Sequence, residues 1–318
     1  MASGQGSGAI FICAAATQLT ETMETSMKAY QSLFKMHREQ DLGAVFAHFY
    51  AINGDYNEAF AIVGRQTVDG IDAWSFQQQR FKDKYAHQGL PKLRNYLNYT
   101  FKRLLELDGQ DPGKYFVFSV DGNWASFNTG LQNAHGSDLL AVFEKYRPNI
   151  QATGRPATDW VFKGCYTPGD ASFQSHFGRA CPDIAWYSTD SRDFVFDTSY
   201  GLERDVFDHL FERAKERAGL PNVPDEVVRN YLRGALENLI PKIRRNYKVA
   251  IPVYYVEEKR MQLLLPFNSA SNANDVSCFL IDRDDDLKTY RLKTIFDLDH
   301  AYFSARLITR PDKDWLNP

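Results

Sequence analysis

The sequence predicts an α+β protein, in which a mixed or mostly antiparallel sheet is flanked by helices and a helical segment is added at the N-terminus. The first observation is the spacing of apolar residues, which switches several times between the helical and the strand period. The second is the order of these segments, since helices and strands come in runs rather than in the alternation of a parallel sheet. The third is composition: 44% of the 318 residues are apolar, including 23 Phe and 17 Tyr, which suits one large packed domain or two small ones.

The N-terminal half begins with predicted helices and continues with predicted strands. Apolar residues recur at three- and four-residue spacing over residues 21–52 and again over residues 93–107, as on one face of a helix. The turn GQDPG at residues 109–113 ends the second of these helices. Strands are expected next, at residues 115–120, 124–127, 141–146 and 159–165, with a DGN hairpin turn between the first two and an exposed connection at 147–158.

A long helix and an antiparallel meander are predicted for the C-terminal half. Asp225 follows a loop marked by two prolines and is suited to cap a helix whose apolar residues keep helical spacing to Ile243. Pro241 is expected to kink this helix or to mark its last turns. Four strands with polar turns are expected before a last helix, at residues 249–256, 261–267, 276–281 and 289–293.

Charge and cysteine usage exclude some classes of protein. The formal net charge is −3, so attraction to nucleic acid or to a membrane would need a local patch. The apolar run at residues 9–16 is too short to cross a bilayer and lacks the preceding basic residues of a signal peptide. Cys13, Cys165, Cys181 and Cys278 form no CxxC pair and are expected to be reduced thiols. We therefore expect a soluble, intracellular, cytoplasmic protein without a membrane partner.

Positive charge is concentrated at the end of the long predicted helix, in the stretch KIRRNYK at residues 242–248. The cations are Lys242, Arg244, Arg245 and Lys248, with Asn246 and Tyr247 between them. One interpretation is that they complement the helix dipole, which is worth about 0.3–1 kcal/mol for each exposed cation. However, four cations within seven residues also repel one another. Because Arg and Lys neutralise phosphates and Tyr stacks on bases, the alternative is a site for a phosphate-bearing ligand.

The C-terminal stretch repeats this pattern, because Arg306 and Arg310 lie four residues apart, on one face of the last predicted helix if that helix extends so far. Asp297, Asp299 and His300 precede them. These three residues can bind a metal ion, but the alternative is that one aspartate caps the helix and the histidine lies at the surface.

Further polar candidates lie at or near the ends of predicted strands. Asn128 and Thr129 come directly after one strand, where they can bond their own backbone in a turn or offer donors to a ligand. Lys145 and Lys163 lie near the ends of two others, where lysines are usually solvated.

Common catalytic and cofactor motifs are absent from the sequence, which has no GxGxxG after a strand, no GxxxxGK[ST], no HExxH and no GxSxG. The acidic stretch DRDDD at residues 282–286 lacks the Gly and the Glu that a calcium loop needs, so a solvated hairpin turn is expected. We expect no cofactor and no resident metal.

Several motifs, taken in order, resemble those of a known family. They are NYLNYTF at 95–101, FNTGL at 127–131, FEK at 143–145, WVFKG at 160–164, RRNYKVAIP at 244–252, QLLLP at 262–266 and ARLI-x-RPD-x-DWL at 305–316. The chain resembles a large microbial family of domains of unknown function, whose members often carry cold-shock or LOTUS-type RNA-binding modules. The match covers residues 70–318, which are predicted to form the family core domain, and leaves residues 1–69 as an N-terminal helical extension.

The resemblance implies an association with RNA metabolism and points to polar positions. These are Asn128, Lys145, Lys163, Arg245, Asn246, Lys248 and Arg306. The chain departs from the family pattern at Phe303 and Ser304, which stand where the family has two amides.

Three hypotheses for function follow. The first is a protein that binds RNA or a nucleotide phosphate in a basic cleft, formed by the cations and polar residues named above. The alternative is an RNA-end-processing or nucleotide-hydrolysing enzyme that uses the same cleft, with Asp297, Asp299, Glu144 or His300 as acid or base. In the third the motifs are purely architectural. The expected partner is RNA or a nucleotide, and the sequence identifies no protein partner.

Overall fold

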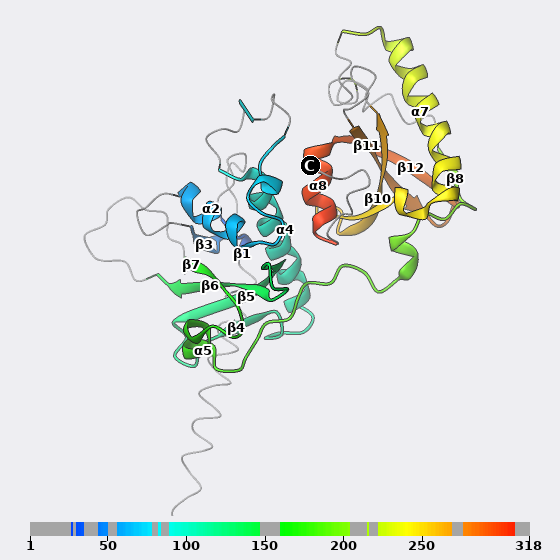
Figure 1. The fold of residues 1–318 in the computed structure, drawn as a ribbon. Coiled ribbons are helices and arrows are strands. Elements are labelled where there is room, and N and C mark those ends of the chain that lie inside the picture. The colour runs from blue at the N-terminus through cyan, green and yellow to red at the C-terminus, as the bar shows by residue number, and fades with distance from the viewer. Residues whose placement is uncertain are drawn as a thin grey trace, which may run out of the picture. The chain divides into compact units, whose positions relative to one another are not determined.

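The chain is an α+β protein, as its sequence predicts, with two five-stranded sheets and accompanying helices (Figure 1). The computed structural model describes residues 27, 30–34, 44–49, 56–77, 82–83, 89–146, 160–203, 215, 222–268 and 276–308. The chain divides into two compact units. Unit 1 comprises residues 1–75 and 84–185, and unit 2 comprises residues 76–83 and 186–318.

Unit 1 contains a sheet with the strand order β3-β7-β6-β5-β4. Its strands are β3 Ala47–His48, β4 Phe116–Phe118, β5 Trp124–Gln132, β6 Asp138–Lys145 and β7 Trp160–Tyr166. Neighbouring strands from β4 to β7 are antiparallel, and the short edge strand β3 runs parallel to β7. The four strands predicted in this region are therefore confirmed, although β5 continues past its predicted end through an irregularity after Asn128.

Helices cover both faces of the unit 1 sheet. They are α2 Tyr56–Gln66, α4 Pro91–Asp108 and α5 Ala171–Phe177, with a short 3-10 turn, η1, at Asp72–Trp74. Helix α4 confirms the helix predicted at residues 93–107, and its Phe101 packs on Phe127 with ring centroids 5.7 Å apart. Helix α5 covers the opposite face, where Phe173 and Phe177 pack on residues of β6.

The helix predicted over residues 21–52 is wrong for residues 30–34 and 44–49, whereas Met27 is helical. This region contributes strands β1 Tyr30–Ser32, β2 Ala44–Val45 and β3. Strands β1 and β2 pair in parallel, and the backbone N–H of Phe46 donates to the carbonyl of Ser32 at 3.0 Å. The aromatic residues that suggested a helix face are buried in the core of unit 1, where Phe46 stacks on Trp160 with centroids 5.7 Å apart. Tertiary packing of short strands has overridden the local spacing, and the domain boundary at residue 69 stays a prediction.

Unit 2 contains a sheet with the strand order β8-β12-β11-β10-β9. Its strands are β8 Gly201–Leu202, β9 Ile251–Tyr255, β10 Arg260–Asn268, β11 Val276–Asp284 and β12 Thr289–Asp297. The antiparallel meander from β9 to β12 is confirmed, and β8 adds a parallel edge to β12. The stretch DRDDD runs from the end of β11 into the turn before β12, in agreement with the predicted hairpin.

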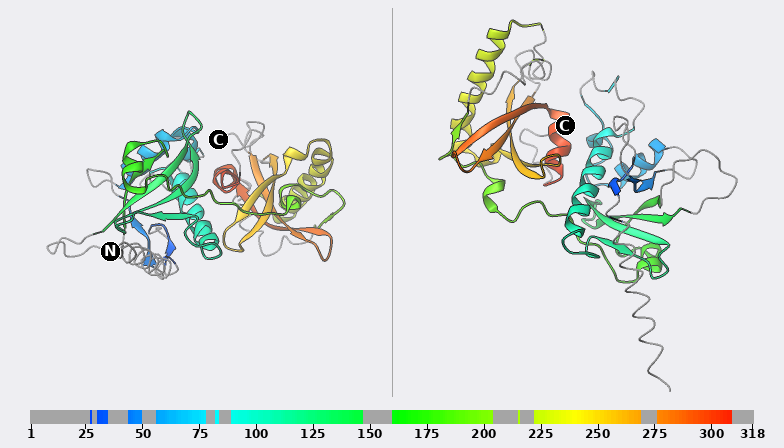
Figure 2. Two further views of the ribbon diagram at one scale, coloured as in Figure 1. Left: turned by 90° about the horizontal axis from the view of Figure 1, so that it is seen from below. Right: turned by 180° about the vertical axis from the view of Figure 1, so that it is seen from behind.

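Two helices lie on opposite faces of this sheet (Figure 2). Helix α7 spans Asp225–Arg245, and helix α8 spans Leu298–Arg306. The predicted apolar stripe of α7, which includes Leu232, Leu236 and Ile243, packs into a core with alternate residues of β10 and β11. Pro224 rather than Asp225 holds the capping position, and Pro241 lies inside a helix that continues for one more turn.

Cys165, Cys181 and Cys278 are free thiols, as predicted, whereas Cys13 lies outside the described residues. Burial raises the pKa of the Cys165 thiol to about 12. None of the described helices combines the length and the apolar composition needed to cross a bilayer.

Candidate nucleic-acid interface

The end of α7 carries a basic patch, which we define as Lys242, Arg244, Arg245, Tyr247 and Lys248. All five side chains are exposed, and the ring of Tyr247 retains 63% of its accessible surface. Within the same turn of the helix, Ile243 is buried in the core of unit 2. The apolar side chain therefore anchors this turn on the sheet while its neighbours extend into solvent.

Asn246 ends the helix and shapes the patch. Its backbone is extended, and its N–H still donates to the carbonyl of Lys242 at 2.9 Å. Its side-chain Oδ1 accepts the N–H of Lys248 at 3.1 Å, which starts the short 3-10 turn η4, Tyr247–Val249. The predicted ligand-binding amide of Asn246 thus has a structural partner. Its local bond closes the turn that presents Tyr247.

The charges of the patch differ from those on the sheet of unit 2. Lys242, Arg244 and Arg245 make no ion pair in the described part of the chain. By contrast, the cations on the unit 2 sheet have carboxylate partners within 3.0 Å: Arg260, Arg283, Arg291 and Lys293. Lys242, Arg244 and Arg245 lie in the last turn of α7, so they also complement its dipole.

Of the two predicted C-terminal members, the structure describes only Arg306. Arg306 ends α8, which lies on the sheet face opposite to α7, and it is only 8% exposed. Arg310 lies outside the described residues. The expectation that these arginines line one cleft with the patch therefore stays a prediction.

Asn128 and Thr129 lie in unit 1 and are engaged by their surroundings. Asn128 Nδ2 donates to Asp138 Oδ2 at 3.0 Å, and its Oδ1 accepts the N–H of Gly130 at 3.0 Å. Thr129 Oγ1 donates to the carbonyl of Leu139 at 2.6 Å and accepts the N–H of Leu131 at 3.2 Å. Both side chains are buried, so the geometry favours the backbone-bonding interpretation over the ligand interpretation.

Lys145 and Lys163 also belong to unit 1. Lys145 is exposed at the end of β6. Lys163 Nζ lies 2.7 Å from Glu144 Oε2 across the sheet, and both side chains are more than 40% exposed. The structure thus assigns four of the predicted site residues to one unit and the α7 patch with Arg306 to the other.

The predicted acid and base candidates have structural partners. Asp297 caps α8 by accepting the N–H of His300 at 3.0 Å, and its carboxylate also contacts His300 Nδ1 at 2.7 Å. Asp299 is 1% exposed and accepts the N–H of Gln77 on both oxygens, at 3.1 and 3.0 Å. Among the described residues, no group of three or more His, Cys, Asp or Glu side chains has the arrangement of a metal site. The capping interpretation is therefore the one that the geometry supports.

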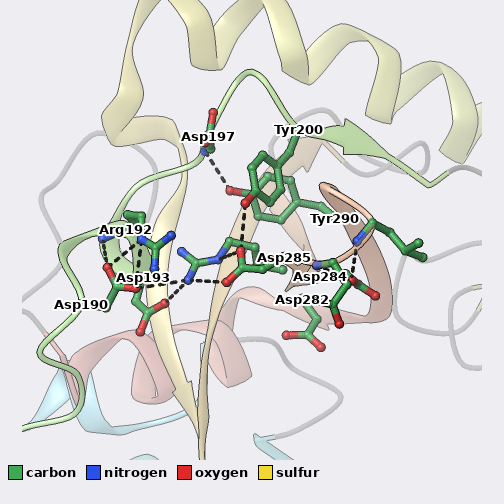
Figure 3. Close-up of polar contacts among 12 residues, drawn as sticks. Asp190, Arg192, Asp193, Asp197, Tyr200, Asp282, Asp284, Asp285 and Tyr290 are labelled. Atoms are coloured by element: carbon green, nitrogen blue, oxygen red, sulfur yellow. Dashed lines mark hydrogen bonds and ion pairs between the residues drawn. The ribbon is translucent and has the colours of Figure 1, made fainter.

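Sequence reasoning missed a cluster of charges around Arg283 (Figure 3). Its guanidinium lies among three carboxylates: Nε is 2.8 Å from Asp285 Oδ1, and Nη2 is 2.9 Å from Asp193 Oδ1 and 3.6 Å from Asp190 Oδ2. Tyr200 Oη donates to Asp285 Oδ1 at 2.9 Å. We call these five residues the Arg283 cluster. It fastens the segment that enters unit 2 to the hairpin between β11 and β12.

Several pKa values are shifted in and around the Arg283 cluster. Hydrogen bonds from the side chain and backbone of Arg192 lower the pKa of Asp190 to about 2. The hydrogen bond to Asp285 raises the pKa of Tyr200, and burial raises that of Tyr290. The one signal in the sequence was an arginine inside the acidic run DRDDD, but two of its partners, Asp190 and Asp193, lie about ninety residues away in the chain.

The fold and the patch define a class of protein: an α+β protein of two compact units with an exposed cationic and aromatic surface at a helix end. The chain belongs to the family described as Domain of unknown function (DUF3825), whose model matches residues 69–315. No curated protein and no solved structure matches the chain. The family predicted from the motifs is thus confirmed at the level of a domain of unknown function, whereas the accompanying RNA-binding modules stay a prediction.

Proposed function

We propose that the protein binds RNA through its phosphates at the basic patch of α7. The observation that carries the proposal is the combination of three exposed cations without an acidic partner and an exposed tyrosine ring beside them. Unpaired cations are available to a phosphate without first breaking an ion pair, and an exposed ring is available for stacking on a base.

Two other interpretations of the patch are complementation of the helix dipole and an architectural role, and each predicts different features. Dipole complementation explains one or two cations at a helix end, but it does not require an exposed aromatic ring between them. An architectural role requires contacts, and the side chain of Arg245 makes no hydrogen bond or ion pair with any described residue. Loss of its side chain is therefore expected to leave the fold intact.

The RNA-end-processing or nucleotide-hydrolysing alternative has no such support. Asp297 and Asp299 are buried and hydrogen-bonded, and Glu144 is paired with Lys163. The patch contains no acid, and the described residues offer no metal site beside it. The enzyme hypothesis therefore stays a prediction from the sequence, and the proposal concerns binding.

Binding of this kind has a characteristic salt dependence. The patch contains four cations, and each phosphate of a single strand that they neutralise releases counterions. Each such phosphate contributes about −0.7 to the slope of the logarithm of the binding constant against the logarithm of the salt concentration. If all four are used, raising the salt from about 50 to about 200 mM weakens binding by roughly 50-fold.

The test is fluorescence anisotropy with a short labelled single-stranded RNA at these two salt concentrations. We expect salt-sensitive binding that is lost in the double variant Arg245→Ala and Lys248→Ala, while its thermal midpoint stays that of the wild type. The matched control is Arg65→Ala with Arg179→Ala, which removes the same charge from exposed positions of unit 1. Unchanged affinity in the patch variant, or equal losses in both variants, would refute the proposal.

A further inference from the structure

The sheet face of unit 2 that carries α8 changes from apolar to polar along its length. Leu263 of β10 and Ile281 of β11 are paired in register and point into the core below α7. Their neighbours Gln262 and Asp282 therefore lie side by side on the opposite face, because side chains alternate along a strand. Figure 3 shows the carboxylate of Asp282 directed away from the Arg283 cluster.

Gln262 and Asp282 each present a buried acceptor atom. Gln262 is 2% exposed and Asp282 is 8% exposed. Among the described residues, neither Gln262 Oε1 nor Asp282 Oδ1 receives a hydrogen bond. Buried polar atoms in native proteins nearly always have a partner, so two adjacent exceptions indicate a missing ligand or an ordered water.

The surrounding contacts fix the orientation of both groups. Gln262 Nε2 donates to Glu258 Oε2 at 3.3 Å, which leaves Oε1 as the free end of the amide. Arg260 Nη2 is 3.0 Å from Asp282 Oδ1, and it also donates a hydrogen bond to the carbonyl of Arg283 at 3.0 Å. The arginine balances the charge of Asp282 as an ion pair, although Oδ1 receives no hydrogen bond from a described residue.

Charge balance restricts the chemistry of the ligand. Arg260 lies against Asp282, and Lys293 Nζ lies 3.0 Å from Glu258 Oε1. Since each acid already has a basic partner, the two acceptors suit a neutral group with two adjacent donors rather than a cation. Among nucleobases, guanine alone presents two neighbouring N–H donors, N1–H and N2–H, on its Watson–Crick edge.

The rim of this site has features suited to a nucleotide. Tyr255 is paired in register with Arg260 and is half-buried on the neighbouring strand, where its ring lies on the same face. The side chains of Arg260 and Lys293 are 47% and 37% exposed. Arg260 contacts Asp282, and Lys293 contacts Glu258, the acceptor of the Gln262 amide, so both cations lie close to the two acceptors. An aromatic ring beside them can stack on a base.

We propose that Gln262 and Asp282 form a guanine-binding site, in which the two buried oxygens accept the N1–H and N2–H of the base. The inference rests on the proposed function in that it takes the ligand to be RNA or a nucleotide. It adds a base preference at a position on the opposite sheet face from α7. The basic patch supplies affinity for phosphates, and this site supplies sequence selectivity.

The test is calorimetric titration of the full chain with GMP, AMP, CMP and UMP. We expect GMP to bind roughly 10-fold more tightly than the other three, which is the discrimination that a bidentate base contact provides. Gln262→Met keeps the length of the side chain and removes both polar ends, so it is expected to abolish this preference without lowering the thermal midpoint. Gln174→Met, at an exposed position of α5, is the matched control and is expected to bind like the wild type.

The outcomes separate this inference from the proposed function. Equal affinity for the four mononucleotides, or binding of none of them, would overturn the guanine site, whatever the RNA assay gives. GMP binding of unchanged affinity in Gln262→Met would also overturn it. The same holds if the protein binds methylguanidine rather than GMP and this binding depends on Gln262. A guanine preference that persists when the RNA assay shows no role for the basic patch would support the site and refute the proposed function alone.

Discussion

Replacement of Arg283 by methionine tests how firmly the Arg283 cluster holds unit 2 together. The variant keeps a long side chain but leaves the carboxylates of Asp190, Asp193 and Asp285 together without their shared cation. Exposed ion pairs contribute about 0–1 kcal/mol, whereas removal of one partner from a buried pair costs about 3–5 kcal/mol. Arg283 is 16% exposed and its partners are 23–50% exposed, so the expected loss lies between, at about 1–3 kcal/mol.

The measurement is the thermal midpoint of unit 2, followed by near-ultraviolet circular dichroism. A loss of about 2 kcal/mol corresponds to a decrease of about 4–8 °C for a unit of this size. The matched control is Arg192→Met, whose side chain is 69% exposed although it pairs with Asp190 at 2.7 Å. We expect the control to lose less than about 1 kcal/mol.

The second half of this test measures the stability difference between Arg283→Met and the wild type as a function of pH. The repulsion left by Arg283→Met disappears once the carboxylates are protonated, so the difference from the wild type should shrink as the pH falls below about 4. A pH-independent difference would indicate lost packing instead. If Arg283→Met is no less stable than Arg192→Met at neutral pH, the reasoning about the Arg283 cluster is wrong.

Three further predictions concern single features. The depressed pKa of Asp190, about 2, means that its contribution to stability is present above the ordinary pKa of about 4 and is lost as the pH falls toward 2. In Arg192→Met a carbon-detected NMR titration should find this pKa raised toward its ordinary value, because the side-chain hydrogen bond is lost while the backbone one remains, and an unchanged value would contradict the assigned cause. Gly130→Ala should destabilise unit 1 by more than Gly113→Ala, because both glycines have positive φ but only a Cβ at Gly130 would meet a neighbour, Tyr96 Oη at 2.8 Å. Urea denaturation should show a loss of about 1 kcal/mol for Gly113→Ala and about 2–4 kcal/mol for Gly130→Ala. Equal losses would contradict the steric argument. Iodoacetamide should label exposed Cys181 well before buried Cys165 and Cys278 in the native protein, as peptide mass spectrometry can show, and faster labelling of Cys165 would contradict its burial and raised pKa.

Local sequence patterns predicted the long, regular elements because one face of each is buried. Helices α4 and α7 keep apolar residues at helical spacing over many turns, and the meander alternates apolar residues with polar turns. The same spacing predicted a helix over residues 21–52, but the aromatic residues described there lie in or beside short strands. These residues are buried in a core that the rest of unit 1 forms. Parallel edge strands of two residues, such as β3 and β8, carry no local pattern.

The candidate site could be predicted only where its signal was local. The four cations at the end of α7 are neighbours in the sequence, and the structure adds that Lys242, Arg244 and Arg245 have no described acidic partner. Whether Asn128 and Thr129 served a turn or a ligand depended on Asp138 and Leu139, which only the folded sheet brings into contact. The Arg283 cluster and the pairing of Gln262 with Asp282 likewise depend on contacts between distant segments.

The discontinuity of unit 2 limits how this protein can be divided or rearranged in evolution. The chain passes between the two units three times, after residues 75, 83 and 185, and the short insert contributes Gln77, whose N–H satisfies both oxygens of buried Asp299. A gene rearrangement that transferred residues 186–318 alone would remove the Gln77 donor from that carboxylate. The two units are thus expected to be inherited together, as a single module, which is how the family match from residue 69 to residue 315 treats them.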